Sequence, residues 1–192
     1  MRIIAGVAKG RTLGTVAGAT RPTSDRAREG LFSSLTSEFG DFLGLNVLDL
    51  FGGSGAIGLE ALSRGASIVH VIERDPDAQK TIENNYELVK KNQPVGKFHL
   101  YAMSAQRFVS DPAKEKYHIV YIDPPFDFID GEVEEIISKL RLGEFLKDDA
   151  LIAVERASKA SKFSWPEGFT PARERKYGAV SIFYGNYSAE NG

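Results

Sequence analysis

The chain has 192 residues, of which 42% are hydrophobic and 26% charged, and it contains no cysteine. This composition is typical of a soluble globular protein with one main core, and the absence of cysteine excludes disulfides, thiolate metal sites and cysteine nucleophiles. The net charge of −2 conceals two basic segments, residues 1–30 and 156–177, each with a net charge of +4, around an acidic middle with −9. Either these segments are solvated loops, or they converge in space to hold a polyanion.

The chain begins with short extended pieces punctuated by glycines, which predicts a hairpin arm over residues 1–22. Thr23 or Ser24 then caps a helix, with Asp25 in its first turn. Apolar side chains recur on one face of this helix, at Ala27, Leu31, Phe32 and Leu35.

From residue 45 onward, strands alternate with helices. The predicted strands are 47–51, 68–72, 98–102, 117–122 and 151–154, and the predicted helices are 57–63, 76–91, 104–109 and 133–140. A late strand at 180–184 is expected to pair with 173–177 across Gly178. This order predicts an α/β fold with a mainly parallel, doubly wound sheet, whose ligands bind at the carboxyl ends of the strands.

A glycine-rich turn follows the first predicted strand, from Asp49 to Gly58. Gly53, Gly55 and Gly58 match the dinucleotide-binding pattern G-x-G-x-x-G. Glycines let a ligand approach the backbone, and the helix that begins here presents free N–H groups. The pattern fits an NAD-dependent dehydrogenase and an S-adenosylmethionine (SAM) enzyme equally well.

A carboxylate, Glu73, ends the second predicted strand, 18 residues after Gly55. At this position it can accept hydrogen bonds from both ribose hydroxyls of a nucleoside. It argues against NADP, but it leaves NAD and SAM as alternatives.

The loop that ends the fourth predicted strand, Asp123-Pro124-Pro125-Phe126, separates these alternatives. Consecutive prolines stiffen the loop, and an acceptor beside an aromatic ring suits a planar base with an exocyclic amine. In this hypothesis the Asp123 carboxylate and the Pro124 carbonyl accept the two N–H bonds of the amine, and Phe126 stacks on the base. The amine lone pair then faces a methyl donor, and catalysis is mainly positioning.

Two further stretches point to one family. Residues 21–32, Arg-Pro-Thr-Ser-Asp-Arg-Ala-Arg-Glu-Gly-Leu-Phe, and residues 58–66, Gly-Leu-Glu-Ala-Leu-Ser-Arg-Gly-Ala, accompany the two loops. Over residues 2–184 the chain resembles the bacterial 16S rRNA guanine-N2 methyltransferases. The resemblance implies a SAM-dependent, Rossmann-like fold with a mainly parallel seven-stranded sheet, a C-terminal antiparallel hairpin and a small N-terminal hairpin. It implies methyl transfer to the N2 amine of a guanine in 16S rRNA, within a partly assembled small ribosomal subunit.

The resemblance also implies roles for individual residues. The catalytic residues are Asp123, Pro124, Pro125 and Phe126. The residues expected to bind SAM are Asp49, Phe51, Gly52, Gly53, Gly55, Glu73, Arg74, Ala102, Met103 and Thr23. Arg21 and Thr23 belong to the Arg-Pro-Thr signature, where the helix start can meet either the SAM carboxylate or the RNA backbone.

Two positions depart from the family pattern. Gly52 stands where the family usually has alanine, and we expect the loop to be slightly looser there. Tyr101 stands where many SAM enzymes carry an acid or amide facing the adenine amino group. We therefore assign adenine recognition to backbone groups near Ala102 and Met103.

The basic segments are the expected RNA-binding surface, with Arg2, Lys9, Arg11, Arg21, Arg26 and Arg175 as its candidates. We expect a hairpin arm (1–22), a methyltransferase domain (23–187) and a tail (188–192). No stretch approaches the roughly 18 apolar residues of a membrane span, and the absence of cysteine fits a reducing cytoplasm. We expect a cytoplasmic protein without membrane or metal partners, and a monomer.

Three alternatives remain open at this point. The first is a SAM-dependent amino methyltransferase that acts on adenine or cytosine of DNA or tRNA. The second is an NAD-dependent oxidoreductase, in which the Asp-Pro-Pro-Phe loop has no role. The third is a non-catalytic RNA-binding assembly factor.

Overall fold

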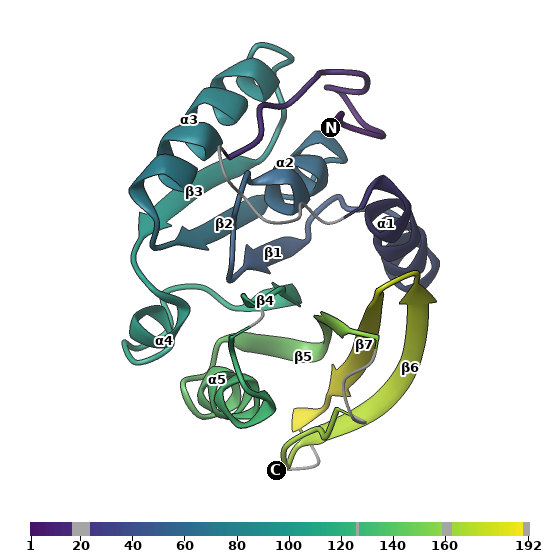
Figure 1. Cartoon of the computed structure of the whole chain (residues 1–192), viewed down its shortest axis with the longest axis vertical. Coiled ribbons are helices and arrows are strands. Elements are labelled where there is room, and N and C mark those ends of the chain that lie inside the picture. Colours follow the sequence, from purple (N-terminus) through teal and green to yellow (C-terminus); the bar gives the residue numbers. More distant parts are fainter. Residues whose placement is uncertain (17–23, 126, 159–162, 190–192) are drawn as a thin grey trace.

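Seven strands form one sheet in the order β3-β2-β1-β4-β5-β7-β6 in the computed structural model, which describes residues 1–16, 24–125, 127–158 and 163–189 (Figure 1). Five neighbouring strands are parallel: β1 (Asn46–Asp49), β2 (Ile68–Glu73), β3 (Lys97–Ala102), β4 (Tyr117–Ile122) and β5 (Leu146–Ala157). The strands β6 (Phe169–Tyr177) and β7 (Val180–Tyr187) form an antiparallel hairpin, and β7 pairs with β5.

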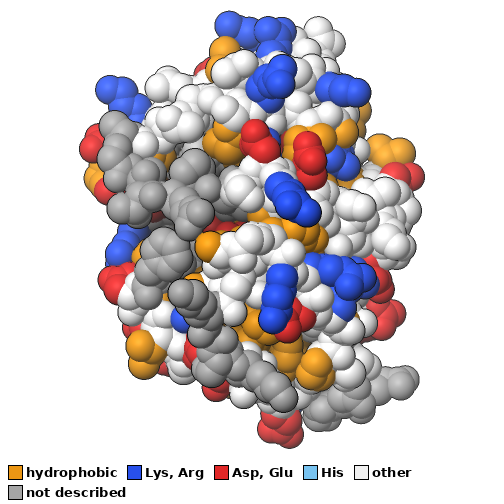
Figure 2. All heavy atoms as spheres, turned by 45° about the vertical axis from the view of Figure 1, so that its right-hand side comes forward, with side chains coloured by type: hydrophobic (Ala, Val, Ile, Leu, Met, Phe, Trp, Pro, Cys, Tyr) orange, Lys and Arg blue, Asp and Glu red, His pale blue; other side chains and the backbone are white. Residues whose placement is uncertain are grey.

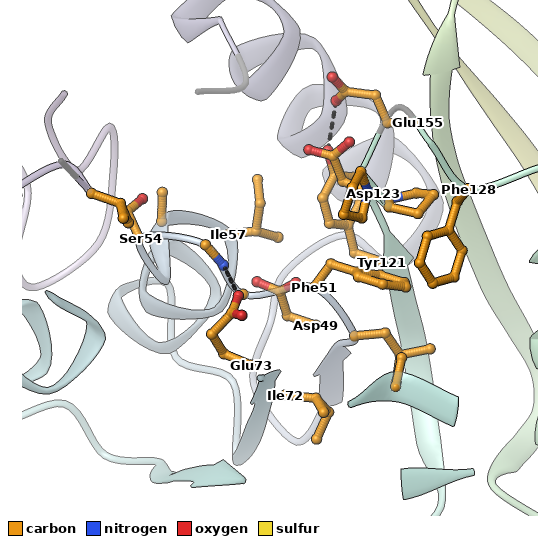
Figure 3. Close-up of a pocket in the computed structure, with 18 of the residues that line it drawn as sticks. Asp49, Phe51, Ser54, Ile57, Ile72, Glu73, Tyr121, Asp123, Phe128 and Glu155 are labelled. Carbon is orange, nitrogen blue, oxygen red and sulfur yellow. Dashed lines mark hydrogen bonds between the residues drawn. The ribbon is translucent and has the colours of Figure 1, made fainter. Parts of the chain in front are cut away.

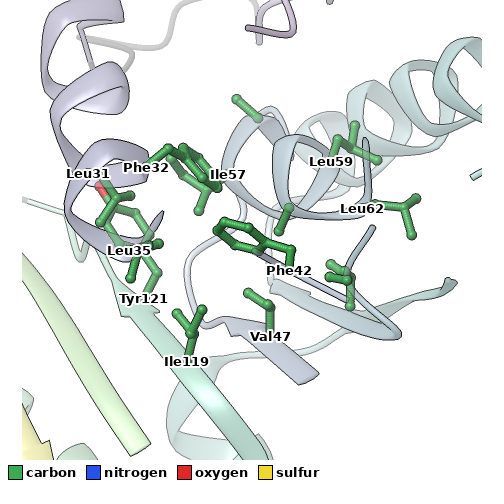
Figure 4. Packing of buried hydrophobic residues seen from close by; sticks show 14 of the residues in the cluster. Leu31, Phe32, Leu35, Phe42, Val47, Ile57, Leu59, Leu62, Ile119 and Tyr121 are labelled. Atoms are coloured by element: carbon green, nitrogen blue, oxygen red, sulfur yellow. The ribbon is translucent and has the colours of Figure 1, made fainter. Parts of the chain in front are cut away.

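Helices cover both faces of the sheet (Figure 1). One face carries α1 (Asp25–Phe39), α2 (Ala56–Ser63) and α3 (Pro76–Lys90), and the other carries α4 (Ala105–Phe108) and α5 (Asp130–Leu142). Because strand side chains alternate, Val47 joins the buried cluster under α1 and α2, whereas Leu48 joins the cluster under α5. Figure 4 shows the first cluster, in which Leu31 and Leu35 of α1 pack near Tyr121 of β4.

The predicted α/β fold is confirmed, and the helices and strands of the βα region occur in the predicted order. Ser24 caps α1, since its side chain accepts a hydrogen bond from the Ala27 amide. The strand β5 begins earlier than predicted, at Leu146 rather than Leu151. The early part of β5 pairs irregularly with β4, and residues 147–149 in it are exposed and polar. The pattern of hydrophobic residues therefore could not predict that the strand begins there.

The N-terminal arm folds back through one antiparallel bridge between Arg2 and Thr12. It is anchored to α2, because the Glu60 carboxylate accepts hydrogen bonds from the amides of Ile4 (2.7 Å) and Ala5 (3.0 Å). The arm also contributes buried side chains to the cluster under α1 and α2: Ile3, Ala8 and Leu13. The arm therefore packs as part of the main core. Among the described residues, no helix is both long and apolar enough to cross a membrane.

Candidate active site

A cavity of about 790 Å³ opens where β1, β2, β4 and β5 reach their carboxyl ends (Figure 3). One part of its wall comes from β1, β2 and the loop after β3: Asp49, Phe51, Gly52, Gly53, Glu73, Arg74 and Met103. Another part comes from β4, β5 and the loop after β4: Tyr121, Asp123, Pro124, Pro125, Phe128 and Glu155. The cavity thus brings the glycine-rich turn and the proline loop, 70 residues apart in the chain, to one site.

The glycine-rich turn is held against the end of β2. The Gly52 amide donates to the Ile72 carbonyl (2.9 Å), and the Gly53 amide donates to Oε2 of Glu73 (2.8 Å). Gly53 and Gly55 have φ values of 53° and 77°, which favour glycine because a side chain is strained there. The turn is therefore a defined cradle ahead of α2.

Gly52 fits the packing more tightly than expected from sequence. A Cβ atom at this position would lie 2.4 Å from Cγ1 of Val71 and 3.0 Å from Cδ1 of Ile82. The turn is thus closely packed on β2 at Gly52 rather than loosened. Asn85 of α3 adds a brace, since its Nδ2 donates to the Ser54 carbonyl (2.9 Å).

Asp49 is the buried charge of the site. The residue is 1% exposed, and its carboxylate oxygens form no full hydrogen bond among the described residues; the backbone amides of Phe51 and Gly58 are its polar neighbours. The pKa of Asp49 is raised from its ordinary 3.8 to about 7, mainly by burial; the backbone amides of Phe51 and Gly58 oppose this rise, and the charge of Glu73 contributes to it. A buried carboxylate without a partner is costly, so this position fits a ligand that brings a cation or a donor.

Glu73 differs from Asp49 in having backbone partners. Its Oε2 accepts from the Gly53 amide and its Oε1 accepts from the Asp75 amide, both at 2.8 Å. Glu73 therefore fixes the end of β2 and the glycine turn together, while its remaining lone pairs are available to a ligand in the cavity.

Some of the other residues expected to bind SAM line the cavity, and some do not. Arg74 and Met103 line the cavity, whereas Gly55 and Ala102 are not among its lining residues. Tyr101 is also outside the lining, and its ring packs with Phe108 (5.1 Å between centroids) in the cluster under α5. Thr23 lies outside the described residues.

The proline loop holds Asp123, Pro124 and Pro125 at the cavity, and Phe126 lies outside the described residues. The loop turns back through a hydrogen bond from the Phe128 amide to the Pro125 carbonyl (3.0 Å). Two contacts support this turn: Phe128 packs edge-on against Phe51 (5.3 Å between centroids), and Nη2 of Arg156 donates to the Phe128 carbonyl (2.7 Å).

Sequence reasoning missed several residues of the β4–β5 side. Tyr121, Phe128 and Glu155 line the cavity, and the Tyr121 hydroxyl donates to Oε2 of Glu155 (2.6 Å). Glu155 follows the predicted strand 151–154 as Glu73 follows the predicted strand 68–72. The same strand-end argument that selected Glu73 therefore also applies to Glu155.

Parts of both basic segments line the cavity. Met1 of the arm and Ser24 before α1 line it, as do Tyr177, Ala179 and Val180 around the β6–β7 turn. Figure 2 presents the face that includes the right-hand side of Figure 1, and Lys and Arg side chains occur over it among acidic and apolar ones. The expected RNA-binding residues that the structure describes are all exposed: Arg2, Lys9, Arg11, Arg26 and Arg175. Arg21 lies outside the described residues.

Three described arginines of the basic segments are not exposed and have structural partners instead; one of them, Arg173, pairs with Glu38 (3.2 Å). Arg28 is 1% exposed, and its Nη2 donates to the Arg2 carbonyl (2.6 Å) and to Asp25 (3.0 Å). Arg156 forms an ion pair with Asp130 (2.8 Å) beside the proline loop. The net charges of the segments thus overstate the charge available to a polyanion. Within the described residues, no group of three His, Cys, Asp or Glu side chains is placed to hold a metal ion.

Comparisons with known proteins cover nearly the whole chain. Residues 1–186 match the family model described as Conserved hypothetical protein 95. The chain is 35% identical to Ribosomal RNA small subunit methyltransferase D of Escherichia coli K12 over 182 residues, which cover 94% of this chain and 87% of that protein. It is 34% identical to the protein of the same name from Haemophilus influenzae, covering 94% of this chain and 91% of that one.

Solved structures agree with this match. A structure from Escherichia coli, provisionally described as a methyltransferase, superimposes with a TM-score of 0.84 at 34% identity, over 98% of each chain. Magnesium protoporphyrin IX methyltransferase from Synechocystis, solved with bound SAM, has a TM-score of 0.66 at 15% identity, over 95% of this chain and 88% of that one. The second comparison shows that the fold is one that SAM-dependent methyltransferases use.

Proposed function

The chain belongs to the Conserved hypothetical protein 95 family, and from this premise we propose that it transfers a methyl group from SAM to the exocyclic N2 amine of a guanine in 16S rRNA. The observation that carries the proposal is the cavity, which joins a buried, unpartnered carboxylate (Asp49) to the Asp123-Pro124-Pro125 loop. The names of the relatives support ribosomal RNA as the substrate, and the resemblance of the proline loop to those of amino methyltransferases supports guanine N2.

The residues on the β1–β2 side of the cavity fit SAM, which supplies an electrophilic methyl group on a positively charged sulfur. Asp49 offers a buried carboxylate to the ammonium group of the methionine part, since that cation would compensate the unpaired negative charge. The glycine turn lets the ligand approach the backbone, and Glu73 accepts from the ribose hydroxyls. Arg74 and Met103 then flank the adenosine.

The residues of the proline loop position the acceptor amine. The Asp123 carboxylate and the Pro124 carbonyl accept its two N–H bonds, and Phe126 stacks on the base. Holding both hydrogens directs the nitrogen lone pair toward the methyl donor, and no covalent enzyme intermediate is needed. The ion pair of Arg156 with Asp130 and its bond to the Phe128 carbonyl keep this loop in place.

The rim of the cavity fits a large anionic substrate. Residues of the arm, the residue that caps α1 and residues of the β6–β7 turn all line the cavity. Exposed arginines on these elements would contact phosphates, so that a base enters the cavity while the backbone of the RNA stays outside. We place this substrate in the small ribosomal subunit, at a stage when the target guanine is still accessible.

The test is methyl transfer from labelled SAM to small subunits purified from cells that lack this enzyme. We expect label in the 16S rRNA. Asp123→Ala should lower the rate by about a hundredfold or more, because the amine loses its principal acceptor, while SAM affinity in calorimetry stays within about threefold of wild type. Asp111→Ala is the matched control, since Asp111 is exposed and its one ion pair within the described residues is with Arg107 (3.6 Å).

Three results would contradict the proposal. Binding of NADH in place of SAM would indicate an oxidoreductase. Label in adenine or cytosine alone, in DNA or tRNA, would assign a different amino methyltransferase. Unchanged methylation by the Asp123→Ala enzyme would remove the proline loop from catalysis.

A further inference from the structure

The pair formed by Tyr121 and Glu155 has no role in the proposed reaction so far. Glu155 is 5% exposed and still lines the cavity. Its Oε2 accepts the 2.6 Å hydrogen bond from the Tyr121 hydroxyl, and no hydrogen bond within the described residues uses its Oε1. Burial raises the pKa of Glu155, and the bond from Tyr121 opposes that rise. The hydroxyl therefore fixes the orientation of a carboxylate whose second oxygen is left for a ligand.

Glu155 and Asp123 come from neighbouring parallel strands at the same level. The register pairs Ile122, the last residue of β4, with Val154 of β5, so Asp123 directly after β4 is at the level of Glu155 on β5. Tyr121 and Ala153 belong to the cluster under α1 and α2, and alternation places Asp123 and Glu155 on that same face. Figure 3 shows both carboxylates at the cavity and the hydrogen bond from the Tyr121 hydroxyl to Glu155.

Two adjacent carboxylates select a base edge that carries two adjacent donors, because an ionised carboxylate only accepts hydrogen bonds. Guanine is the standard base with this edge, since its N1–H lies next to its N2 amine. Adenine and cytosine each place an acceptor nitrogen beside the exocyclic amine, and that acceptor would face the second carboxylate unfavourably. The acid pair therefore suits guanine and rejects the other amino bases.

We propose that Glu155 accepts a hydrogen bond from N1–H of the target guanine, beside the N2 amine held by Asp123, and thereby determines the choice of guanine over adenine and cytosine. Tyr121 acts as a positioning residue for Glu155. This inference rests on the proposed function, because it concerns the base that enters the same cavity.

The experiment compares two acceptors in otherwise identical small-subunit rRNA. The target guanine is kept, or it is replaced by 2,6-diaminopurine, which retains the 2-amino group but has an acceptor at N1. Wild-type enzyme should prefer guanine by about tenfold or more in kcat/KM, as expected for a site that matches or mismatches hydrogen-bonding groups. In Glu155→Gln the amide can donate to N1 of diaminopurine, so the preference should fall toward one.

Two further variants control this comparison. Glu87→Gln changes an exposed glutamate on α3 that pairs with Lys90 (3.4 Å), and it should behave as wild type. Tyr121→Phe removes only the hydroxyl, so the preference for guanine should fall in the same direction by a smaller factor. Should Glu155→Gln fail to fold, as judged by loss of SAM binding, the Tyr121→Phe comparison decides.

The outcomes are distinguishable. A Glu155→Gln enzyme that binds SAM and keeps the wild-type preference for guanine would overturn the inference. So would an equal loss on both acceptors, because it would assign Glu155 a structural role alone. Wild-type enzyme that methylates neither acceptor, although it binds SAM, would overturn the proposed function and this inference with it.

Discussion

At the residue scale, carboxylates at the carboxyl ends of neighbouring strands differ in their partners, and their roles follow from these differences. Asp49 is buried without a partner, Glu73 is bound by two amides, and Glu155 is bound by a tyrosine hydroxyl. Sequence reasoning selected Glu73 from its place at a strand end and Asp123 from the proline loop, and the family resemblance supplied Asp49. Glu155 also follows a predicted strand, but it was missed because it lacks the short spacing from the glycine-rich turn that drew attention to Glu73.

Asp49 makes the apoprotein pH-dependent. Its pKa is about 7 in the folded chain, against 3.8 as the ordinary value, so the folded chain binds this proton more tightly than the unfolded chain. The contribution of Asp49 to stability is therefore present at low pH and is lost as pH rises from about 4 to about 7. One pKa unit corresponds to about 1.4 kcal/mol of free energy.

Asp49→Asn, which mimics the protonated acid, should remove this loss. Without SAM, its free energy of unfolding in urea should be close to wild type near pH 4 and higher than wild type by a few kcal/mol at pH 8. Asp148→Asn, on an exposed stretch of β5, serves as control and should show no such trend. A difference between Asp49→Asn and wild type that is the same at both pH values would contradict this account of Asp49.

At the element scale, hydrophobic periodicity predicted which segments are helices and strands, but packing between elements decided the details. The cap at Ser24 and the apolar face of α1 were predictable, because they depend on nearby residues. The burial of Arg28 was not, since it depends on the arm folding back so that the Arg2 carbonyl meets the guanidinium. The role of Asn85 was equally hidden, because its side chain bonds Gly14 and Ser54, far away in the chain.

Adding one methyl group at Gly52 tests how tightly the glycine turn packs on β2. Gly52→Ala places a Cβ atom 2.4 Å from Val71, so we expect a loss of about 1–3 kcal/mol in the free energy of unfolding. SAM affinity should fall as well, because the turn must shift. Gly131→Ala is the matched control: it lies in α5, where an added Cβ meets nothing within 4 Å, and it should be neutral or stabilising by up to about 1 kcal/mol. Equal effects of the two changes would contradict the tight packing at Gly52.

At the scale of the whole molecule, most residues that line the cavity come from the acidic middle of the chain, and parts of both basic segments also line it. Sequence predicted the segregation of charge. Sequence could not predict which basic side chains form structural bonds within the protein, because Arg28 and Arg156 bond to residues of other elements, Arg2 and Asp130. The exposed, described cations of the two segments are Arg2, Lys9, Arg11, Arg26, Arg175 and Lys176.

The salt dependence of RNA binding measures this surface. If about six of these cations neutralise phosphates, the plot of log K against log salt concentration should have a slope of roughly −4 to −5. Arg175→Ala should reduce the magnitude of the slope by about 1. Lys147→Ala should leave the slope unchanged, because Lys147 lies near the start of β5, at the end of the strand away from the cavity. A slope near zero for wild type would contradict an electrostatic grip on RNA.

The central claim is that this cavity methylates the N2 amine of guanine, and the chemical identity of the product tests it most directly. Small subunits from cells that lack the enzyme are incubated with labelled SAM and the wild-type chain, and their 16S rRNA is digested to nucleosides for chromatography and mass spectrometry. The account predicts N2-methylguanosine as the labelled nucleoside. N6-methyladenosine as the sole labelled product, or the absence of any labelled nucleoside, would contradict it.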